Sequence, residues 1–332
     1  MANDPGLSND TCIFMEAIPG DRGNHDPNNV WWLSPDISLV GPVSGPDNAD
    51  AGQVNPVNVT VRRKSASSNC IFPGDESLIT ELWVANPSLV MSPRVRNSAK
   101  QIALTGTTLP PEGSTAIQHF DFTPPAVPHP GDPQSPGHKC LAARVYPSSL
   151  VPSAANFFTP GDQHVAQHNL CIVKTTSQNF TFAVNTVNPD GPLTPIPPPL
   201  PPVVKHPVKL RAILDLHPSN FVNRVVGRAL EAAGGAHQFR TSPLPNGFRF
   251  DLAHLQASKI VDHSHGGVIH FPPHTNPSFE AQIELTERQV TPLTFLADLH
   301  GTQPGDACIF HLIQTSISNA AEGGLTVVAL RQ

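Results

Sequence analysis

Residues 191–202 read GPLTPIPPPLPP, and seven of these twelve residues are proline. Proline fixes φ and lacks a backbone N–H, so the segment predicts an extended polyproline II conformation and neither helix nor paired strand. Such a segment acts as a semi-rigid spacer. We therefore expect two domains, with residues 191–203 as the proline-rich linker that joins them.

The composition indicates a folded, turn-rich β protein. The chain has 332 residues, of which 38 are proline, 39% are hydrophobic and 14% are charged. This length suits two domains of ordinary size. The hydrophobic residues occur in short alternating runs bounded by proline and glycine, which is typical of strands. The predicted fold class is all-β.

The first domain is expected over residues 31–190. Residues 57–61 and 78–84 alternate with a period of two, as half-buried strands do. Further strands are predicted at 31–33, 37–40, 101–104, 115–122, 139–146, 170–175 and 179–184. Short strands separated by Pro/Gly turns indicate a Greek-key β-sandwich. Residues 1–30, rich in Asn, Asp, Gly and Pro with one apolar island at 12–15, predict an extended N-terminal arm or an edge strand.

The second domain is expected over residues 204–332, as another β-sandwich with one helix. The helix is predicted at about 220–233, where an apolar stripe follows Ser219 or Asn220 as a cap and Gly234-Gly235 as the end. A strand pair is predicted at 203–216, and further strands at 248–252, 267–271, 278–285, 291–299, 307–315 and 324–330. The helix should cover an open end or one face of this sandwich.

A set of spaced residues in the first domain carries a family resemblance. These are Asp47, Ala51, Gly52, Asn55, Val57, Val59 and Val61, then Leu82-Trp83, and finally GHKCLAARV at 137–145. The pattern resembles the bacterial cell-adhesion-related sandwich, an immunoglobulin-like module, over roughly residues 31–185. The resemblance implies an immunoglobulin-like fold for this domain and a role as a binding or spacer unit of a surface protein.

The five cysteines are Cys12, Cys70, Cys140, Cys171 and Cys308, and none has C-x-x-C spacing. An odd number leaves at least one thiol unpaired within the chain. Apolar neighbours around four of them predict buried free thiols, which behave as small hydrophobic side chains. A single disulfide that uses Cys12 or Cys70 is the alternative.

Residues 262–274, DHSHGGVIHFPPH, form the sharpest candidate metal site. His263 and His265 would share one face of a strand, and Asp262 or His270 could supply a third ligand to zinc, copper or iron. The alternative is that residues 262–274 form a loop whose histidine rings are solvated. With sixteen histidines in one chain, some lie close together by chance. His164 and His168, four residues apart, form a second candidate pair.

Several functions find no support in the sequence. No nucleophile elbow, P-loop, dinucleotide fingerprint or His-Glu-x-x-His occurs, so we expect no enzyme, no catalytic residues and no cofactor beyond such a transition metal. A net charge of −6 without a basic cluster beyond Arg62-Arg63-Lys64 argues against a nucleic-acid partner. No apolar run reaches the about 18 residues of a membrane span. The N-terminus lacks the features of a Sec-type signal.

The expected function is therefore structural. We expect a non-enzymatic subunit of a homo-oligomeric assembly, such as a filament, appendage or shell, built through sandwich edges and the N-terminal arm. An adhesin-like binding module for a glycan or a protein is the alternative, and a metal-binding protein that uses the 262–274 cluster is the second. Uncharged, Pro/Thr/Asn-rich sandwiches favour an extracellular or surface appendage, while the missing Sec signal leaves a cytoplasmic location open.

Overall fold

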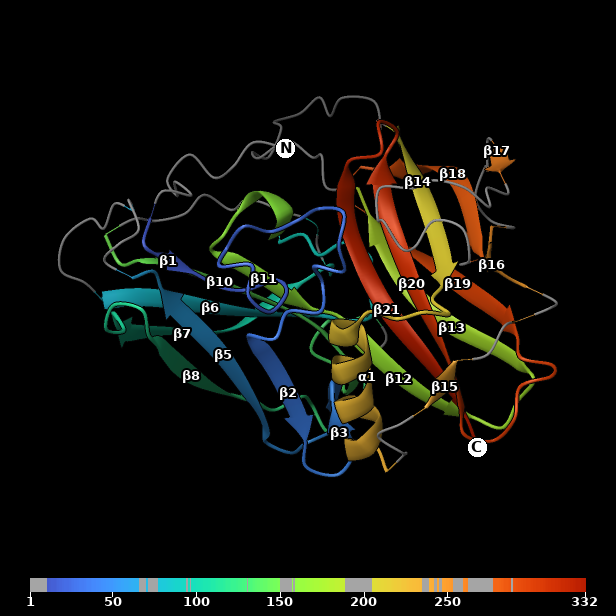
Figure 1. Ribbon diagram of the computed structural model, residues 1–332, viewed down its shortest axis with the longest axis horizontal. Coiled ribbons are helices and arrows are strands. Elements are labelled where there is room, and N and C mark those ends of the chain that lie inside the picture. Colours follow the sequence, from blue (N-terminus) through green and yellow to red (C-terminus); the bar gives the residue numbers. More distant parts are fainter. Residues whose placement is uncertain are drawn as a thin grey trace.

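The computed structural model describes residues 11–65, 70, 77–93, 95, 97–129, 131–149, 157, 159–188, 205–234, 239–241, 244, 247–252, 259–261, 277–287 and 289–332. Most of the secondary structure in these residues is β-strand, and they contain one α-helix, α1 (Asn220–Ala232). The prediction of an all-β fold with a single helix is confirmed. Two groups of strands lie side by side, with α1 between them (Figure 1).

The first group of strands forms two facing sheets. One sheet contains β1 (Ile13–Phe14), β2 (Ile37–Gly41), β3 (Gly45–Pro46), β5 (Asn55–Arg63) and β8 (Thr115–Phe122). The other contains β6 (Ser77–Ala85), β7 (Lys100–Thr108), β10 (Cys140–Pro147) and β11 (Val165–His168). Along β5, Val57, Val59 and Val61 are fully buried and the residues between them are partly exposed. The period-two pattern thus directs one face of each strand into the core between the sheets.

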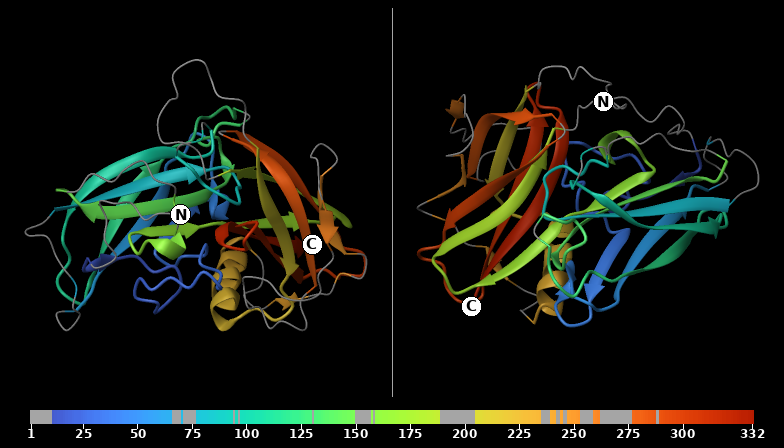
Figure 2. Two further views of the ribbon diagram at one scale, coloured as in Figure 1. Left: turned by 90° about the horizontal axis from the view of Figure 1, so that it is seen from above. Right: turned by 180° about the vertical axis from the view of Figure 1, so that it is seen from behind.

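The second group also forms two facing sheets, seen from above and from behind in Figure 2. The larger sheet contains β12 (Leu170–Thr175), β14 (Lys205–Leu214), β15 (Arg240–Thr241), β17 (Lys259–Val261), β18 (Ser278–Thr286), β20 (Asp306–Ser316) and β21 (Ala321–Arg331). The smaller contains β13 (Asn179–Val187), β16 (Phe248–Asp251) and β19 (Val290–Asp298). We call these two groups the first and second sandwich.

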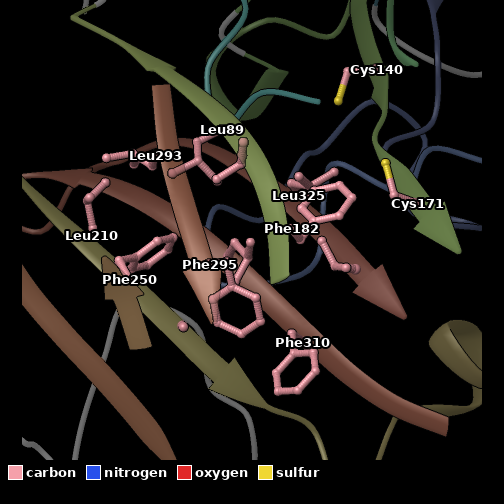
Figure 3. Close-up of a cluster of buried hydrophobic side chains, with 14 of the residues drawn as sticks. Leu89, Cys140, Cys171, Phe182, Leu210, Phe250, Leu293, Phe295, Phe310 and Leu325 are labelled. Carbon is pink, nitrogen blue, oxygen red and sulfur yellow. The ribbon is translucent and has the colours of Figure 1, made fainter. Parts of the chain in front are cut away.

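Aromatic rings fill the core of the second sandwich (Figure 3). The Phe295 ring packs edge-on against Phe310 at 4.9 Å and against Phe250 at 5.7 Å between ring centroids. Phe180 contacts both Phe295 and Phe310 at 6.5 Å. Edge-to-face pairs of this kind add to the gain from burying the rings. The same cluster continues into the first sandwich through buried residues such as Leu89.

Strand pairing around the proline-rich segment differs from the expected domain boundary at residue 190. Strands β12 and β13, expected in the first domain, pair with the second sandwich: β12 runs parallel to β21 and β13 runs antiparallel to β19. The sequence pattern fixes which residues form these strands but contains no information on their partners. Residues 191–203 lie outside the described residues. The strands before and after them, β13 and β14, both belong to the second sandwich.

The N-terminal residues 11–30 are packed against the first sandwich and do not extend from it as an arm. Strand β1 pairs with Arg62 and Arg63 of β5, and Met15 is fully buried. The backbone N–H of Met15 donates to the Gln163 carbonyl at 2.9 Å. Residues 1–10 lie outside the described residues. An intermolecular role for residues 11–30 would therefore require them to leave this core.

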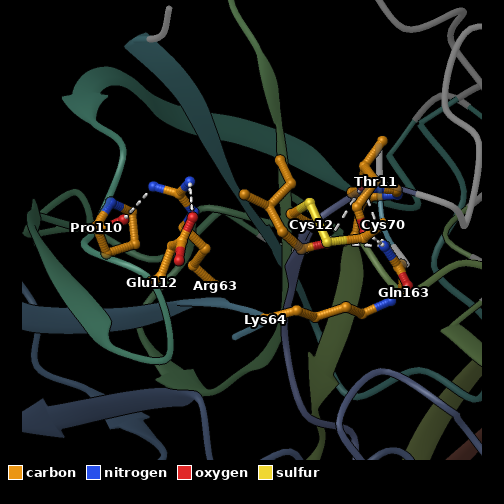
Figure 4. Close-up of a disulfide and its surroundings, with 10 residues drawn as sticks. Thr11, Cys12, Arg63, Lys64, Cys70, Pro110, Glu112 and Gln163 are labelled. Atoms are coloured by element: carbon orange, nitrogen blue, oxygen red, sulfur yellow. Dashed lines mark hydrogen bonds and ion pairs between the residues drawn. A yellow bond between two sulfur atoms is a disulfide. The ribbon is translucent and has the colours of Figure 1, made fainter. Parts of the chain in front are cut away.

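A disulfide also holds the N-terminal segment. Cys12 is bonded to Cys70, close to the Gln163 side chain, which donates to the carbonyls of Thr11 and Ile13 (Figure 4). Cys140, Cys171 and Cys308 are free and buried. The chain thus combines the two alternatives that the sequence left open. Three thiols act as small core residues, and one disulfide closes a long loop.

Strands β20 and β21 are buried on both faces. On one face Phe310, Leu312 and Val327 join the aromatic core. On the other face Ile309 and Val328 pack against α1 and the Trp31-Trp32 pair. The helix begins after Ser219, whose hydroxyl accepts from the Val222 N–H, and it turns Val222, Val226 and Leu230 inward. The expectation that the helix covers one face of a sheet is confirmed.

Two glycines in β21 allow the sandwiches to meet. A Cβ at Gly324 would lie 2.3 Å from the Trp32 ring, and one at Gly323 would lie 1.9 Å from the Leu89 carbonyl oxygen. The Trp32 indole N–H donates to the Thr326 hydroxyl at 3.0 Å. Leu89 N–H also donates to the Asn185 carbonyl at 2.9 Å. The contact depends on these two residues having no side chain.

Gly324→Ala should destabilise the protein because the new methyl group overlaps the Trp32 ring. Overpacking of a core typically costs about 1–3 kcal/mol in the free energy of unfolding. Gly106→Ala in β7 is the matched control, since its Cβ would meet nothing closer than 3.9 Å. Urea denaturation of both variants measures the difference. Equal stability of the two variants would contradict the close packing of β21 on Trp32.

Candidate functional site

The predicted metal cluster lies outside the described residues. This applies to His263, His265 and His270 and to the neighbouring Asp262 and His274. In the part of the chain that the structure describes, no group of three or more His, Cys, Asp or Glu side chains is arranged to hold a metal ion. The metal site at 262–274 stays a prediction.

His164 and His168 do not share a ligand position. The His164 ring contacts the Asp162 carboxylate at 2.8 Å through Nδ1 and the Thr11 hydroxyl through Nε2. The His168 ring faces the Ser34 carbonyl at 2.8 Å and the Asp47 carboxylate at 3.1 Å. Both rings are buried and use both nitrogens in protein contacts. Neither nitrogen is therefore free to bind a metal that the two histidines would share.

A groove of about 420 Å³ lies beside His168, between the first sandwich and helix α1. Strand β3 contacts α1 here (Figure 1). Gly45, at φ 84°, permits this approach, since a Cβ at Gly45 would lie 3.2 Å from the Ala232 carbonyl oxygen. The apolar lining comes mainly from β2 and α1 and includes Ile37, Leu39, Val40, Leu170, Phe221 and Val225.

An Asp47–His168 ion pair forms the polar base of the groove. Asp47 has φ 58°, and its backbone is fixed because its N–H donates to the Leu39 carbonyl and its carbonyl accepts from Lys139 N–H. Both nitrogens of His168 face acceptors, so both must donate, which requires the imidazolium form. Burial alone would lower the pKa of His168, but the Asp47 charge and the hydrogen bonds to Asp47 and Ser34 raise it above the ordinary value.

Two arginines on α1 give the groove a positive charge. Arg224 and Arg228 are exposed, lie one helical turn apart and both line the groove. Within the described residues neither guanidinium has a hydrogen bond or an ion pair. Among the lining residues Asp47 is the only acid, and His168 already neutralises it. The groove therefore suits a ligand that combines an anionic group with an apolar part.

Some residues of the groove belong to patterns that can be recognised in the sequence. Asp47 belongs to the spaced pattern that resembles the adhesion-related sandwich, and His168 belongs to the second histidine pair. Arg224 and Arg228 share the exposed side of the predicted helix, which could have indicated a binding face. The sequence offered no sign that these residues, up to 181 positions apart, would meet in one groove.

The chain matches no family model and no curated protein. Among solved structures, the CupB6 tip adhesin from Pseudomonas aeruginosa matches at 10% identity, covering 89% of this chain and 95% of that chain, with a TM-score of 0.19. A TM-score this low supports no conclusion about fold or function. In the described residues, no helix has both the length and the apolar character of a membrane span.

The Asp47–His168 pair should make stability depend on pH. The pKa of His168 is raised in the folded protein. The ion pair therefore stabilises the folded state fully at pH values below the pKa of His168 in the unfolded chain. This stabilisation is lost as the pH rises through the pKa of His168 in the folded protein. We expect the free energy of unfolding to fall as the pH rises above about 6.5, the ordinary pKa of histidine, and to fall less in Asp47→Asn. Urea denaturation across this range measures both slopes.

The matched control for this experiment is Asp298→Asn, which removes the carboxylate beside the exposed His300. Solvent screens that pair, so its variant should keep the wild-type slope. Identical slopes for wild type and Asp47→Asn would show that His168 does not titrate as the buried pair requires.

Proposed function

We propose that this chain is a non-enzymatic binding protein whose groove beside α1 holds an acidic, partly apolar segment of another protein. One observation carries the proposal: Arg224 and Arg228 stand without partners in the described chain, above an apolar groove whose single carboxylate is already paired. Charge-assisted hydrogen bonds from arginine to a carboxylate are strong and directional. The groove volume falls within the range of small-ligand sites.

The arrangement of His168 supports binding over catalysis. A general base needs a free nitrogen lone pair near its substrate, and both nitrogens of His168 donate to fixed acceptors. The described lining residues include Ser34 and Ser38, and neither has a hydrogen bond from its hydroxyl to a histidine. The proposed site therefore recognises a ligand without converting it.

The disulfide between Cys12 and Cys70 indicates in which compartment the protein acts. Disulfides persist in oxidising compartments and are rare in the cytosol, so the Cys12–Cys70 bond supports a place outside the cytoplasm. This agrees with a surface-exposed binding role, in which the two sandwiches would be immunoglobulin-like modules of an adhesion-related protein.

Reversing the charge of Arg224 and Arg228 to glutamate should abolish binding of acidic peptides. The probe is a fluorescein-labelled peptide of alternating leucine and glutamate, read by fluorescence anisotropy. Each charge-assisted bond contributes about 1.5–3 kcal/mol, so the double variant should bind at least about tenfold more weakly. Arg249→Glu, at an exposed arginine on β16, has the same charge change as each single variant, Arg224→Glu or Arg228→Glu, and is their control. Equal loss in this control would point to nonspecific attraction.

A second candidate function, assembly through open strand edges, rests on β7 and β8. Within the described chain β7 pairs with β6 alone and β8 with β5 alone, so each leaves one edge open. The two edges lie on the same side of the first sandwich, because the Gln118 amide donates to the Thr107 hydroxyl at 2.8 Å. Leu104 and Ile117 on these strands are 55% and 54% exposed. Open edges with exposed apolar residues favour pairing with another copy.

Leu104→Lys combined with Ile117→Lys should convert such an assembly to monomers, because charges on an edge strand oppose strand addition. Light scattering gives the molar mass of wild type and variant. Val127→Lys is the control, since Val127 is 67% exposed but lies in the loop after β8. A monomeric wild type would remove the assembly function and leave the groove proposal untouched.

A further inference from the structure

Lys139 is an unusual buried residue in the first sandwich. It directly precedes β10, is 1% exposed and belongs to the largest fully buried side chains. Its Nζ lies 2.7 Å from the Asn86 side-chain oxygen Oδ1, which is its hydrogen-bond partner in the described chain. No carboxylate in the described residues forms an ion pair with it. A buried ammonium without a counter-ion is unstable, so the environment favours the neutral amine.

The electrostatics of the site agree with this reading. Burial lowers the pKa of Lys139 to about 8, against weaker opposing effects from Cys140, Cys171 and Asp132. A substantial fraction of the amine is therefore neutral near physiological pH. A neutral lysine amine in an apolar setting is a nucleophile.

Asn86 presents its amide carbon to this amine. The side-chain oxygen accepts from Lys139 Nζ, and the side-chain nitrogen Nδ2 donates to the Asp132 carbonyl at 3.2 Å. Both ends of the carboxamide are thus fixed. Because a C=O bond is about 1.23 Å long, Nζ must lie within about 4 Å of the amide carbon. Pairing of Ala85 with Cys140 holds the two neighbouring residues opposite each other.

We propose that Lys139 and Asn86 form an intramolecular isopeptide bond between the end of β6 and the start of β10. The neutral Nζ attacks the amide carbon Cγ of Asn86, and the bond from Cγ to Nδ2 breaks. The proton that leaves Nζ goes to Nδ2, which departs as ammonia. One amide replaces another, so the step needs no oxidant or reductant.

The local sequence removes the competing reaction of asparagine. Asn86 is followed by Pro87, which has no backbone N–H. The succinimide route, in which the next backbone nitrogen displaces ammonia, is therefore blocked at this position. Loss of ammonia from Asn86 then needs a nucleophile other than the next backbone nitrogen, and the Lys139 amine is placed to be that nucleophile.

The bond would reinforce the contact between the two sandwiches. Asn86 lies next to Pro87, whose carbonyl accepts from Asn185 N–H at 2.8 Å. Leu89, two residues further on, packs in the shared core. A covalent link at Asn86 would fix the strand end from which this contact starts, and would hold it under load.

Intact-mass spectrometry of the folded, disulfide-reduced protein tests the proposal. We expect the wild type to be lighter than its sequence by one ammonia molecule, and Lys139→Arg and Asn86→Ala to have their full sequence masses. A protease digest of the wild type should contain a branched peptide that joins the segments around residues 86 and 139. Circular dichroism shows whether the variants fold.

Two results would overturn the proposal. The first is a folded wild type with the full sequence mass after long incubation at about pH 8 to 9, where the amine is neutral. The second is a loss of ammonia that persists in Lys139→Arg, since it would place the reaction at another residue. The wild-type mass decides the matter even if a variant does not fold.

Discussion

Two-sided burial of β20 and β21 is the constraint on which the rest of the structure depends. A strand buried on both faces needs an apolar layer on each side. The aromatic core with β13, β16 and β19 supplies one layer, and α1 with Trp31 and Trp32 supplies the other. The tryptophans lie between β1 and β2 of the first sandwich. The second sandwich is therefore completed by residues that come from within the first, and the aromatic cluster contains residues of both sandwiches.

This arrangement explains which parts of the fold were predictable. Periodicity reports how the faces of a segment are buried, so the strands at 57–61 and 78–84 and the helix at 220–233 fall within or beside β5, β6 and α1. The choice of a strand's partner depends on long-range complementarity, which leaves no local pattern. For that reason the sequence places β12 and β13 in the first domain, whereas they pair with β21 and β19 of the second sandwich. The apolar island at residues 12–15 indicates an edge strand as one alternative, but the polar residues around it give no sign that Ile13 and Met15 are fully buried.

The candidate groove was predictable only in fragments. Each contributing side chain had an ordinary local explanation: Asp47 in a turn, His168 in a strand, Arg224 on a solvated helix face. These residues come together only because α1 packs beside β3 in the tertiary structure.

The burial of Lys139 could not be predicted for a different reason. Lysine is rarely fully buried, so sequence reasoning places it at the surface, and its surroundings become visible only when strand pairing puts it opposite Asn86.

The parallel pairing of β12 with β21 has a consequence for how the chain reaches its native state. β21 lies between β12 and β20 inside the larger sheet, and it joins residues 170 and 326 as direct neighbours. Contacts this distant in sequence slow folding because a long loop must close first. During synthesis, the edges of β12 and β20 that pair with β21 would stay unpaired until residues 321–331 leave the ribosome. The second sandwich thus becomes resistant to aggregation only after residues 321–331 have been synthesised and β21 has paired.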